Sequence, residues 1–536
     1  MRIRIKAIFT LAALAVFLLP GIPASAQKAV TENTYKFGRT LSLINEFYVD
    51  SVNLNDLTEK AIVEMLKNLD PHSVYISAKD VKEMNEPLNG NFEGIGIQFN
   101  ILRDSIIVIE PIPGGPSEKV GLRAGDRIVK IDNEKVTGIS ISTNGVRSRL
   151  MGMKGTKVNL EVYRKGVPGL LEFTIVRGKI PINSVDAAYM LDKETGYIKL
   201  NKFAATTYDE FTKAVDSLKR HNMKNIVIDL RSNGGGYMAA ATDIADMFFR
   251  DKRLLVYLIG RKTPRQDYES SGNGSLSSDR VAILTDEGSA SASEILAGAI
   301  QDWDRGIIVG RRTFGKGLVQ NAFYLPDGSM IRLTIARYYT PTGRLIQAPY
   351  NEGYEKYIEN YYKRYSNGEL MGVDSVHHPD SLKFRTLINK RIVYGGGGIT
   401  PDLFVPADTS YYTDFYKNVV RKGVLNSFAL EYSDKNRKEL TSAYKKFDDF
   451  KKNFNFSQAD IASFISEAEK SGVKYDEAQF NTSKNEMLTL LKAIVAANLW
   501  QTNEYYEIIN EDDHVIRDAL KVITDKAAYN KLLGYK

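Results

Sequence analysis

The sequence has 536 residues, a formal net charge of +7, 43% hydrophobic residues and no cysteine. The absence of cysteine excludes disulfides, a thiolate nucleophile and a cysteine-bound zinc site. The charge is small for this length and diffuse, which argues against a nucleic-acid-binding protein. The length predicts three or four domains.

Residues 1–26 have the pattern of an export signal. Three basic residues within the first six positions precede the apolar run 7–19, and Ala24-Ser25-Ala26 offers the small residues that a signal peptidase accepts. The run is shorter than the ~20 apolar residues that a bilayer-spanning helix needs. We therefore expect a cleaved signal peptide and a periplasmic protein, free or attached to the cell envelope.

Residues 27–87 are predicted to form an N-terminal helical region. Apolar residues recur at helical spacing up to position 66, with a break near residues 50–55. The segment Leu69-Asp70-Pro71-His72-Ser73 ends this pattern with a turn signal. A structural role is favoured for His72 over a catalytic one, because it stands beside a proline turn.

Residues 88–178 predict a small, mostly β domain. A strand-like stretch at 105–112 leads into a short helix after Pro116, a Gly-Asp turn and two alternating strands at 158–164 and 171–177. This pattern resembles a PDZ domain. The resemblance implies capture of a peptide C-terminus by strand addition, with the carboxylate held by backbone amides. An ordinary hairpin glycine pair is the alternative for the matching loop, whose predicted substrate-binding residues are Gly94, Ile95, Gly96, Ile97, Gln98 and Phe99.

Strands and helices alternate from residue 179 onward. Apolar strands at 226–230, 281–285 and 307–309 are separated by helical segments, a pattern that predicts an α/β core with crossover helices. This core is expected over 179–348 and 390–408, interrupted by a tyrosine-rich insertion at 349–389. Residues 409–536 are predicted to form a C-terminal helical domain that serves packing or oligomerisation.

Histidine and metal chemistry find little support in the sequence. None of the five histidines lies beside a Gly-x-Ser-x-Gly nucleophile elbow, and His-Glu-x-x-His does not occur. His377 and His378 are adjacent, so in a strand their side chains would point to opposite faces. We expect no metal and no cofactor.

Two short segments carry the candidate chemistry instead. Ser289-Ala290-Ser291-Ala292-Ser293 lies at a strand end and a helix start, where unpaired amides can meet a developing oxyanion. A cluster of N-cap serines is the alternative interpretation. In Thr313-Phe314-Gly315-Lys316-Gly317 a lysine stands between two glycines, behind an aromatic residue. A lysine that is desolvated among apolar groups has a lowered pKa, so it can take the proton of a serine.

These two segments, their separation of 25 residues, the stretch Asp229–Gly236 and the preceding PDZ-like module together resemble the C-terminal processing peptidases, also called tail-specific proteases. The resemblance covers roughly residues 35–345 and implies a peptidase core of the crotonase-like ββα-spiral type. It implies that Ser291 is the nucleophile, Lys316 the general base and Gln320 the residue that orients the lysine. The oxyanion donors would be the backbone amides of Gly236 and Ala292, and Asp302 is interpreted as structural.

We therefore expect a multidomain α+β protein with helical terminal regions, which acts as a secreted serine endopeptidase. Its PDZ domain would bind C-terminal tails of substrate proteins, and its core would hydrolyse peptide bonds by a Ser-Lys mechanism. Expected partners are proteins with unstructured C-termini, an adaptor protein and a second copy of the chain, bound through the C-terminal helices. The alternatives are a catalytically inactive PDZ scaffold, which the presence of Ser291, Lys316 and Gln320 disfavours, and a small-ester hydrolase, which would leave the PDZ-like module without a role.

Overall fold

The computed structural model describes residues 24–102, 104–372 and 379–535. It divides into two compact units, Met1–Leu66 and Lys67–Lys536. Most of the predicted signal peptide lies outside the described residues, and so do His377 and His378. Within the described part of the chain, no helix combines the length and the apolar character needed to cross a bilayer.

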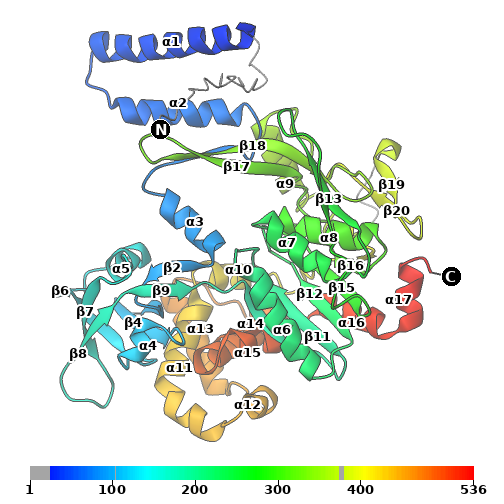
Figure 1. Cartoon of the computed structure of the whole chain (residues 1–536). Helices are drawn as coiled ribbons and strands as arrows, with labels where there is room; N and C mark the ends of the chain where they lie inside the picture. The colour runs from blue at the N-terminus through cyan, green and yellow to red at the C-terminus, as the bar shows by residue number, and fades with distance from the viewer. Residues whose placement is uncertain (1–23, 103, 373–378, 536) are drawn as a thin grey trace, which may run out of the picture. The chain divides into compact units, whose positions relative to one another are not determined.

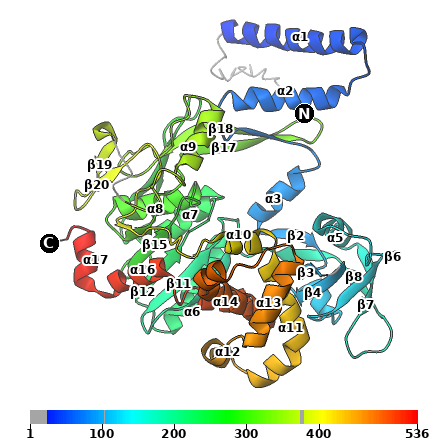
Figure 2. The ribbon, with the colours of Figure 1, turned by 180° about the vertical axis from the view of Figure 1, so that it is seen from behind.

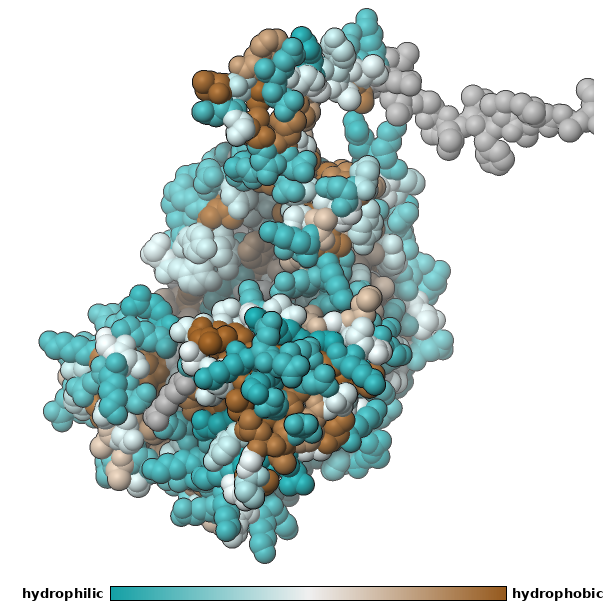
Figure 3. Space-filling model, turned by 90° about the vertical axis from the view of Figure 1, so that its left-hand side faces the viewer, coloured by the Kyte–Doolittle hydropathy of each residue, from teal (hydrophilic) through white to brown (hydrophobic). Residues whose placement is uncertain are grey.

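Among the described residues, the first unit contains helix α1 (Ala24–Phe47) and helix α2 (Leu54–Lys67) up to Leu66. The break between them falls near the predicted one. Several apolar side chains remain on the surface of this unit, where Figure 3 shows brown patches: Val30, Phe37, Leu43, Phe47, Val49 and Met65.

The PDZ region has a small antiparallel sheet in the order β3-β4-β5-β7-β8, with β6 paired to β5. At the beginning and the end of the PDZ region, β2 and β9 form a separate antiparallel pair. The predicted helix after Pro116 and the two predicted alternating strands are confirmed. The elements are β2 (Asn91–Gly94), β3 (Ile97–Leu102), β4 (Ser105–Pro111), α4 (Pro116–Lys119), β5 (Arg127–Ile131), β6 (Glu134–Lys135), α5 (Thr143–Leu150), β7 (Lys157–Tyr163), β8 (Leu171–Val176) and β9 (Gly178–Pro181).

The core is built on a six-stranded sheet in the order β10-β11-β12-β15-β16-β21. In this sheet, strands β11, β12, β15, β16 and β21 run parallel to one another, and β10 pairs antiparallel with β11. The predicted strand–helix alternation is confirmed. The elements are β10 (Val185–Met190), β11 (Thr195–Leu200), α6 (Thr207–Arg220), β12 (Asn225–Asp229), α7 (Met238–Asp246), β15 (Arg280–Thr285), α8 (Ala292–Asp302), β16 (Ile307–Gly310) and β21 (Leu403–Phe404).

Both faces of this sheet are covered, because side chains alternate along each strand. In β12, Ile226 and Ile228 join the apolar cluster that contains α6, α7 and α8. Val227 points to the other face and joins a cluster with α16 (His514–Thr524) and α17 (Lys526–Leu532). Figures 1 and 2 show α7 and α8 on one side of the sheet and α16 on the other.

A second, antiparallel sheet in the order β1-β18-β13-β14, with β17 paired to β18, packs beside the core. Its strand β1 lies within the region 27–87 that was predicted to be helical, and this part of the prediction is wrong. A strand of three residues that pairs with a distant strand is too short to show a recognisable periodicity in the sequence. The elements are β1 (Val74–Ile76), α3 (Val81–Asn89), β13 (Leu254–Ile259), β14 (Gln266–Glu269), β17 (Leu318–Tyr324) and β18 (Met330–Tyr339).

The predicted C-terminal region 409–536 divides its apolar side chains between two cores. Helices α10 to α15 form an apolar cluster of their own, whereas α16 and α17 complete the sheet of the core. The remaining elements are α9 (Tyr354–Lys363), η2 (Asp380–Leu382), β19 (Lys383–Arg385), β20 (Ile392–Tyr394), α10 (Asp414–Arg421), α11 (Val424–Ala443), α12 (Phe447–Asn453), α13 (Gln458–Lys470), α14 (Glu477–Leu499) and α15 (Thr502–Ile509). The domain boundaries stay a prediction.

Candidate active site

A cavity of about 650 Å³ brings the five predicted catalytic and oxyanion residues together. Its walls come from α3, from the glycine-rich turn after β12, from the start of α8 and from strands β17 and β18. The predicted residues that line it are Ser291, Lys316, Gln320, Gly236 and Ala292. Segments that are far apart in the sequence therefore meet at one opening.

The structure distinguishes the three serines of the Ser289–Ser293 motif. Ser289 and Ser293 are fully buried, and their hydroxyls donate to the carbonyl oxygens of Leu230 (2.7 Å) and Asn233 (2.8 Å), respectively. Ser291 is half-buried and lines the cavity. It precedes α8 with φ +57° and ψ −113°, a left-handed conformation that costs energy for a residue other than glycine and is typical of functional turns.

Lys316 enters the cavity from the loop before β17. Its Nζ donates to Oε1 of Gln320 at 3.2 Å, and Nε2 of Gln320 donates to the backbone carbonyl of His72. Burial lowers the pKa of Lys316, which favours the neutral amine that a general base requires. The role of Gln320 in orienting the lysine, which the resemblance implied, stays a prediction.

Gly315 is required beside the lysine. Its φ is +91°, and a Cβ there would lie 2.9 Å from the backbone of Gly397 and Gly398. The glycine run at 395–398 therefore packs directly against the lysine loop, which a larger residue at either place would prevent.

Two residues that line the cavity with Ser291, Ala292 and Gly236, have backbone amides that are candidate oxyanion donors. Ala292 is the first residue of α8, where amides lack a partner within the helix. Within the described residues, neither the amide of Ala292 nor that of Gly236 donates to a protein acceptor. Gly235 lies against this point, since a Cβ on it would be 2.8 Å from Cβ of Ser291 and 2.9 Å from the amide nitrogen of Ala292. The geometry fits an oxyanion hole.

Glu294 is a functional candidate that the sequence analysis missed. It is fully buried, and its carboxylate accepts from the amides of Ser291 (2.8 Å), Gly315 (2.8 Å) and Lys316 (2.9 Å) and from the hydroxyl of Thr313 (2.6 Å). Burial raises the pKa of Glu294 to about 7. One carboxylate thus ties the serine turn to the lysine loop. The Ser-x-x-Glu spacing of a capping box was the available signal.

Tyr338 of β18 makes a second link between the serine turn and the lysine loop. Its buried hydroxyl donates to the carbonyl oxygen of Lys316 and lies 3.1 Å from the carbonyl oxygen of Ser291. Nothing in the sequence around Tyr338 pointed to this contact.

Comparison with known proteins identifies the family. The chain is 36% identical over 354 residues to the carboxy-terminal-processing protease of Bartonella bacilliformis, an alignment that covers 64% of this chain and 80% of that protein. It is 34% identical over 330 residues to the carboxy-terminal processing protease CtpB of Bacillus subtilis, covering 61% and 68%, respectively.

The chain belongs to the carboxy-terminal processing proteases of peptidase family S41. It is a serine-type peptidase with a PDZ domain. Among solved structures, the photosystem II D1 C-terminal processing protease aligns with 31% identity and a TM-score of 0.32, covering 57% of this chain and 88% of that one. Four family models match: peptidase family S41 (194–355), PDZ domain (94–175), activating protease CtpB N-terminal domain (22–80) and a family of unknown function, DUF8443 (415–501).

The PDZ domain of the protease has a groove of about 340 Å³, lined by residues of α3, β2, β3 and α5 and of the segments next to them. Within the described residues, the amides of Ile95 and Gly96 at its end donate to no protein acceptor. The prediction for Gln98 is corrected, because its side chain is exposed and does not line the groove. Successive side chains of a strand point to opposite faces. The other predicted residues line it: Gly94, Ile95, Gly96, Ile97 and Phe99.

His72 lies beside Lys316 and Gln320 of the protease. Its Nε2 is 3.0 Å from the hydroxyl of Tyr357, and its ring packs edge-on against Phe314. Burial, followed by the charge of Lys316, lowers the pKa of His72 to about 4. The imidazole is therefore neutral near pH 7, and its contacts agree with the structural role that was favoured.

The insertion 349–389 braces the lysine loop of the protease. Arg364, at the end of α9, donates to the carbonyl oxygens of Arg312 (2.6 Å) and Thr313 (2.9 Å). Glu369 pairs with both arginines. The insertion thus fixes the backbone of the lysine loop, a role that the sequence did not indicate.

Asp302 has the structural environment that was expected. It is fully buried and paired with the equally buried Arg344, and it accepts from the amide of Thr342 at 2.9 Å. Neither acid nor arginine lines the catalytic cavity. Within the described residues, no three acidic, histidine or cysteine side chains gather as metal ligands would.

Proposed function

We propose that this protease hydrolyses peptide bonds with Ser291 as nucleophile and Lys316 as general base, after its PDZ domain has bound the C-terminal tail of a substrate protein. The observation that carries the proposal is the cavity that joins Ser291, Lys316 and Gln320 to two free backbone amides. A peptide carbonyl placed beside Ser291 would have a nucleophile, a base and oxyanion donors within one opening.

The proposed reaction proceeds through an acyl-enzyme. Neutral Lys316 takes the proton of the Ser291 hydroxyl while Oγ of Ser291 attacks the peptide carbonyl. The amides of Ala292 and Gly236 stabilise the oxyanion that forms. The lysine then gives the proton to the leaving amine as the C–N bond breaks. Lys316 next takes a proton from a water molecule, which attacks the acyl-enzyme ester. The lysine then returns the proton to Oγ of Ser291, so that the ester breaks and Ser291 is free again.

The pH dependence should report the lysine. We expect kcat/KM to rise with pH through the lowered pKa of Lys316, because only the unprotonated amine accepts a proton. His72→Gln should leave this profile in place, since His72 is already neutral above about pH 4. The measurement is kcat/KM of an unfolded protein substrate from pH 5 to 10, with and without a chelator. A profile that His72→Gln abolishes would assign the base to histidine, and inhibition by the chelator would assign the chemistry to a metal.

Tail recognition is proposed from the PDZ groove. The free amides of Ile95 and Gly96 can bind a terminal carboxylate, and Ile97 and Phe99 offer an apolar wall to the last side chain. Amidation of a peptide removes the charge that strengthens such hydrogen bonds. We therefore expect the full-length protease to cleave a peptide with a free, apolar C-terminus faster than its amidated form.

The matched variants are Ile97→Ala in the groove and Val176→Ala on an exposed position of β8. Ile97→Ala should raise KM for the free acid by about tenfold, because buried apolar carbons are lost, and should reduce the preference over the amide. Val176→Ala should change neither. Equal cleavage of acid and amide by the wild type would refute tail recognition while leaving the Ser-Lys chemistry intact.

We also propose that the protease is exported and that it binds further partners. Residues 1–26 support export, and an adaptor protein is retained as a proposed partner. A second copy of the chain is also retained, but the C-terminal helices bury most of their apolar side chains in their own cluster. The exposed apolar side chains of α1, which include Phe37, Leu43 and Phe47, offer an alternative surface for a second copy. Sedimentation of the full chain distinguishes monomer from dimer.

A further inference from the structure

An ion pair connects the C-terminal helices to the start of the glycine-rich turn. Asp513 Oδ2 lies 2.7 Å from Nη1 of Arg231. Its other oxygen caps α16, accepting from the amides of Val515 (2.8 Å) and Ile516 (3.0 Å). Asp513 follows Arg231 by 282 residues and lies outside the segments that match the peptidase and DUF8443 families.

The charges around Arg231 balance only when Asp513 is included. Asp229 accepts from Nε (3.0 Å) and Nη2 (2.6 Å) of Arg231 and also from Nζ of Lys199 (3.3 Å). Two cations therefore share one buried carboxylate, and Asp513 supplies the second negative charge. Burial by itself would lower the pKa of Arg231, but Asp229 and Asp513 raise it well above its usual range. Asp229 is buried, whereas Arg231 and Asp513 are partly exposed, and removing one member of such a network leaves a charge with poorer compensation.

The turn that follows Arg231 presents one of the two oxyanion amides. Asn233 holds this turn against the serine segment, because its carbonyl oxygen accepts from the amide of Ala290 (3.0 Å). Its side-chain oxygen accepts from the amide of Gly235 (2.9 Å). The Gly236 amide therefore belongs to a turn that starts at Arg231 and packs against the serine segment.

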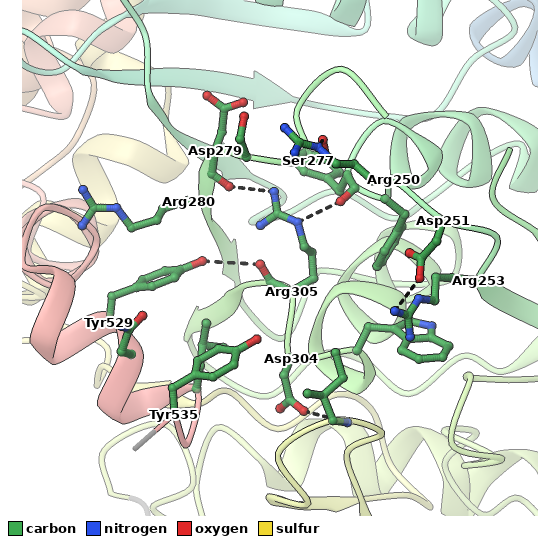
Figure 4. Close-up of a pocket in the computed structure, with 17 residues that line it drawn as sticks. Arg250, Asp251, Arg253, Ser277, Asp279, Arg280, Asp304, Arg305, Tyr529 and Tyr535 are labelled. Carbon is green, nitrogen blue, oxygen red and sulfur yellow. Dashed lines mark hydrogen bonds and ion pairs between the residues drawn. The ribbon is translucent and has the colours of Figure 1, made fainter. Parts of the chain in front are cut away.

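Asp513 is itself held in place by a docked pair of helices. Val515, Ile516, Ala519 and Ile523 of α16 are buried against the core sheet. At the far end, the hydroxyl of Tyr529 in α17 lies 3.0 Å from both the amide and the carbonyl oxygen of Val281. Figure 4 shows Tyr529 reaching from α17 toward the backbone of Arg305. A carboxylate on this scaffold can fix the guanidinium of Arg231.

We propose that Asp513 is a positioning residue for peptide-bond hydrolysis: through Arg231 it holds the Gly234–Gly236 turn, so that the C-terminal helices are part of the catalytic apparatus. This inference rests on the proposed Ser-Lys function. It implies that loss of the Asp513 charge misplaces an oxyanion donor without touching the substrate-binding groove.

Two substitutions separate the charge of Asp513 from its capping role. Asp513→Asn keeps a good helix cap and removes the charge, whereas Asp513→Glu keeps the charge and weakens the cap. Asp525→Asn is the matched control, because Asp525 caps α17 with the same two contacts and is exposed. In the full-length protease, Asp513→Asn should lower kcat about tenfold or more with KM unchanged, and Asp513→Glu should recover most of that loss.

The measurements are kcat and KM for the free-acid peptide, with affinity for an uncleavable peptide tail as a check on folding. The proposal is overturned if Asp513→Asn stays within twofold of wild type, if Asp513→Glu is as slow as Asp513→Asn, or if Asp525→Asn is equally slow. Ser291→Ala, run in parallel, tests the proposed nucleophile separately. Activity remaining in that variant would refute the Ser-Lys function, whereas an inactive Ser291→Ala beside an unaffected Asp513→Asn would refute only the positioning role.

Discussion

Ser291→Ala and Lys316→Ala should each lower kcat by at least about 10⁴-fold, and the double variant should be no slower than either single one. Residues that act as a unit in one step lose nearly all of their effect when one is removed, so their contributions do not add. Both side chains line one cavity, and Lys316 is held at Gln320 by a 3.2 Å hydrogen bond. The measurement is single-turnover cleavage of an unfolded protein substrate.

Ser289→Ala provides the matched serine control. The Ser289 hydroxyl is buried and donates to the carbonyl oxygen of Leu230, so its loss should reduce the free energy of unfolding by about 1 kcal/mol. It should leave kcat within tenfold of wild type. Substantial turnover by Ser291→Ala, or a double variant much slower than both singles, would contradict the assignment of Ser291 and Lys316 as a cooperating pair.

The candidate serine and lysine segments could be picked out of the sequence because their signals are local. Each lies in a run of small residues beside an apolar strand, and this pattern survives in a single sequence. The core sheet was also predictable, since strands such as 226–230 are apolar throughout. The choice among the three serines came only from the resemblance. In the structure, Ser289 and Ser293 donate their hydroxyls to backbone carbonyl oxygens, whereas Ser291 lines the cavity.

The long-range contacts of the residues that support the site were not predictable, because they are set by tertiary packing; for Glu294 the sequence offered only its place in a capping box. Glu294 meets the lysine loop 19 to 22 residues further along the chain, and Asp513 meets Arg231 across 282 residues. No local period or turn signal encodes such distances. The strand β1 escaped detection for the same reason, since its pairing with β18 defines it. A prediction based on local pattern therefore finds candidate reacting groups more readily than the residues that position them.

Glu294→Gln should lower kcat by about 100-fold while KM changes little. A glutamine has the same shape, but its amide nitrogen cannot accept the hydrogen bonds that one carboxylate oxygen receives from the amides of Ser291 and Lys316. The serine turn and the lysine loop would then shift relative to each other, and a displacement of about 1 Å can cost 10²-fold in rate. Glu287→Gln is the control, because Glu287 is half-buried and pairs with Arg311.

The pH profile and the stability of Glu294→Gln separate this role from simple unfolding. The charge of Glu294 raises the pKa of Lys316, so its removal should move the acid limb of kcat/KM to lower pH even as the maximum falls. The folded pKa of Glu294 is about 7, against 4.5 for an unperturbed glutamate. The stability that comes from its protonated form is complete below pH 4.5 and is lost as the pH rises to about 7. Glu294→Gln should lack this loss when urea unfolding is measured at each pH. An acid limb that stays where it is, or a kcat as high as that of Glu287→Gln, would show that Glu294 does not couple the two catalytic segments.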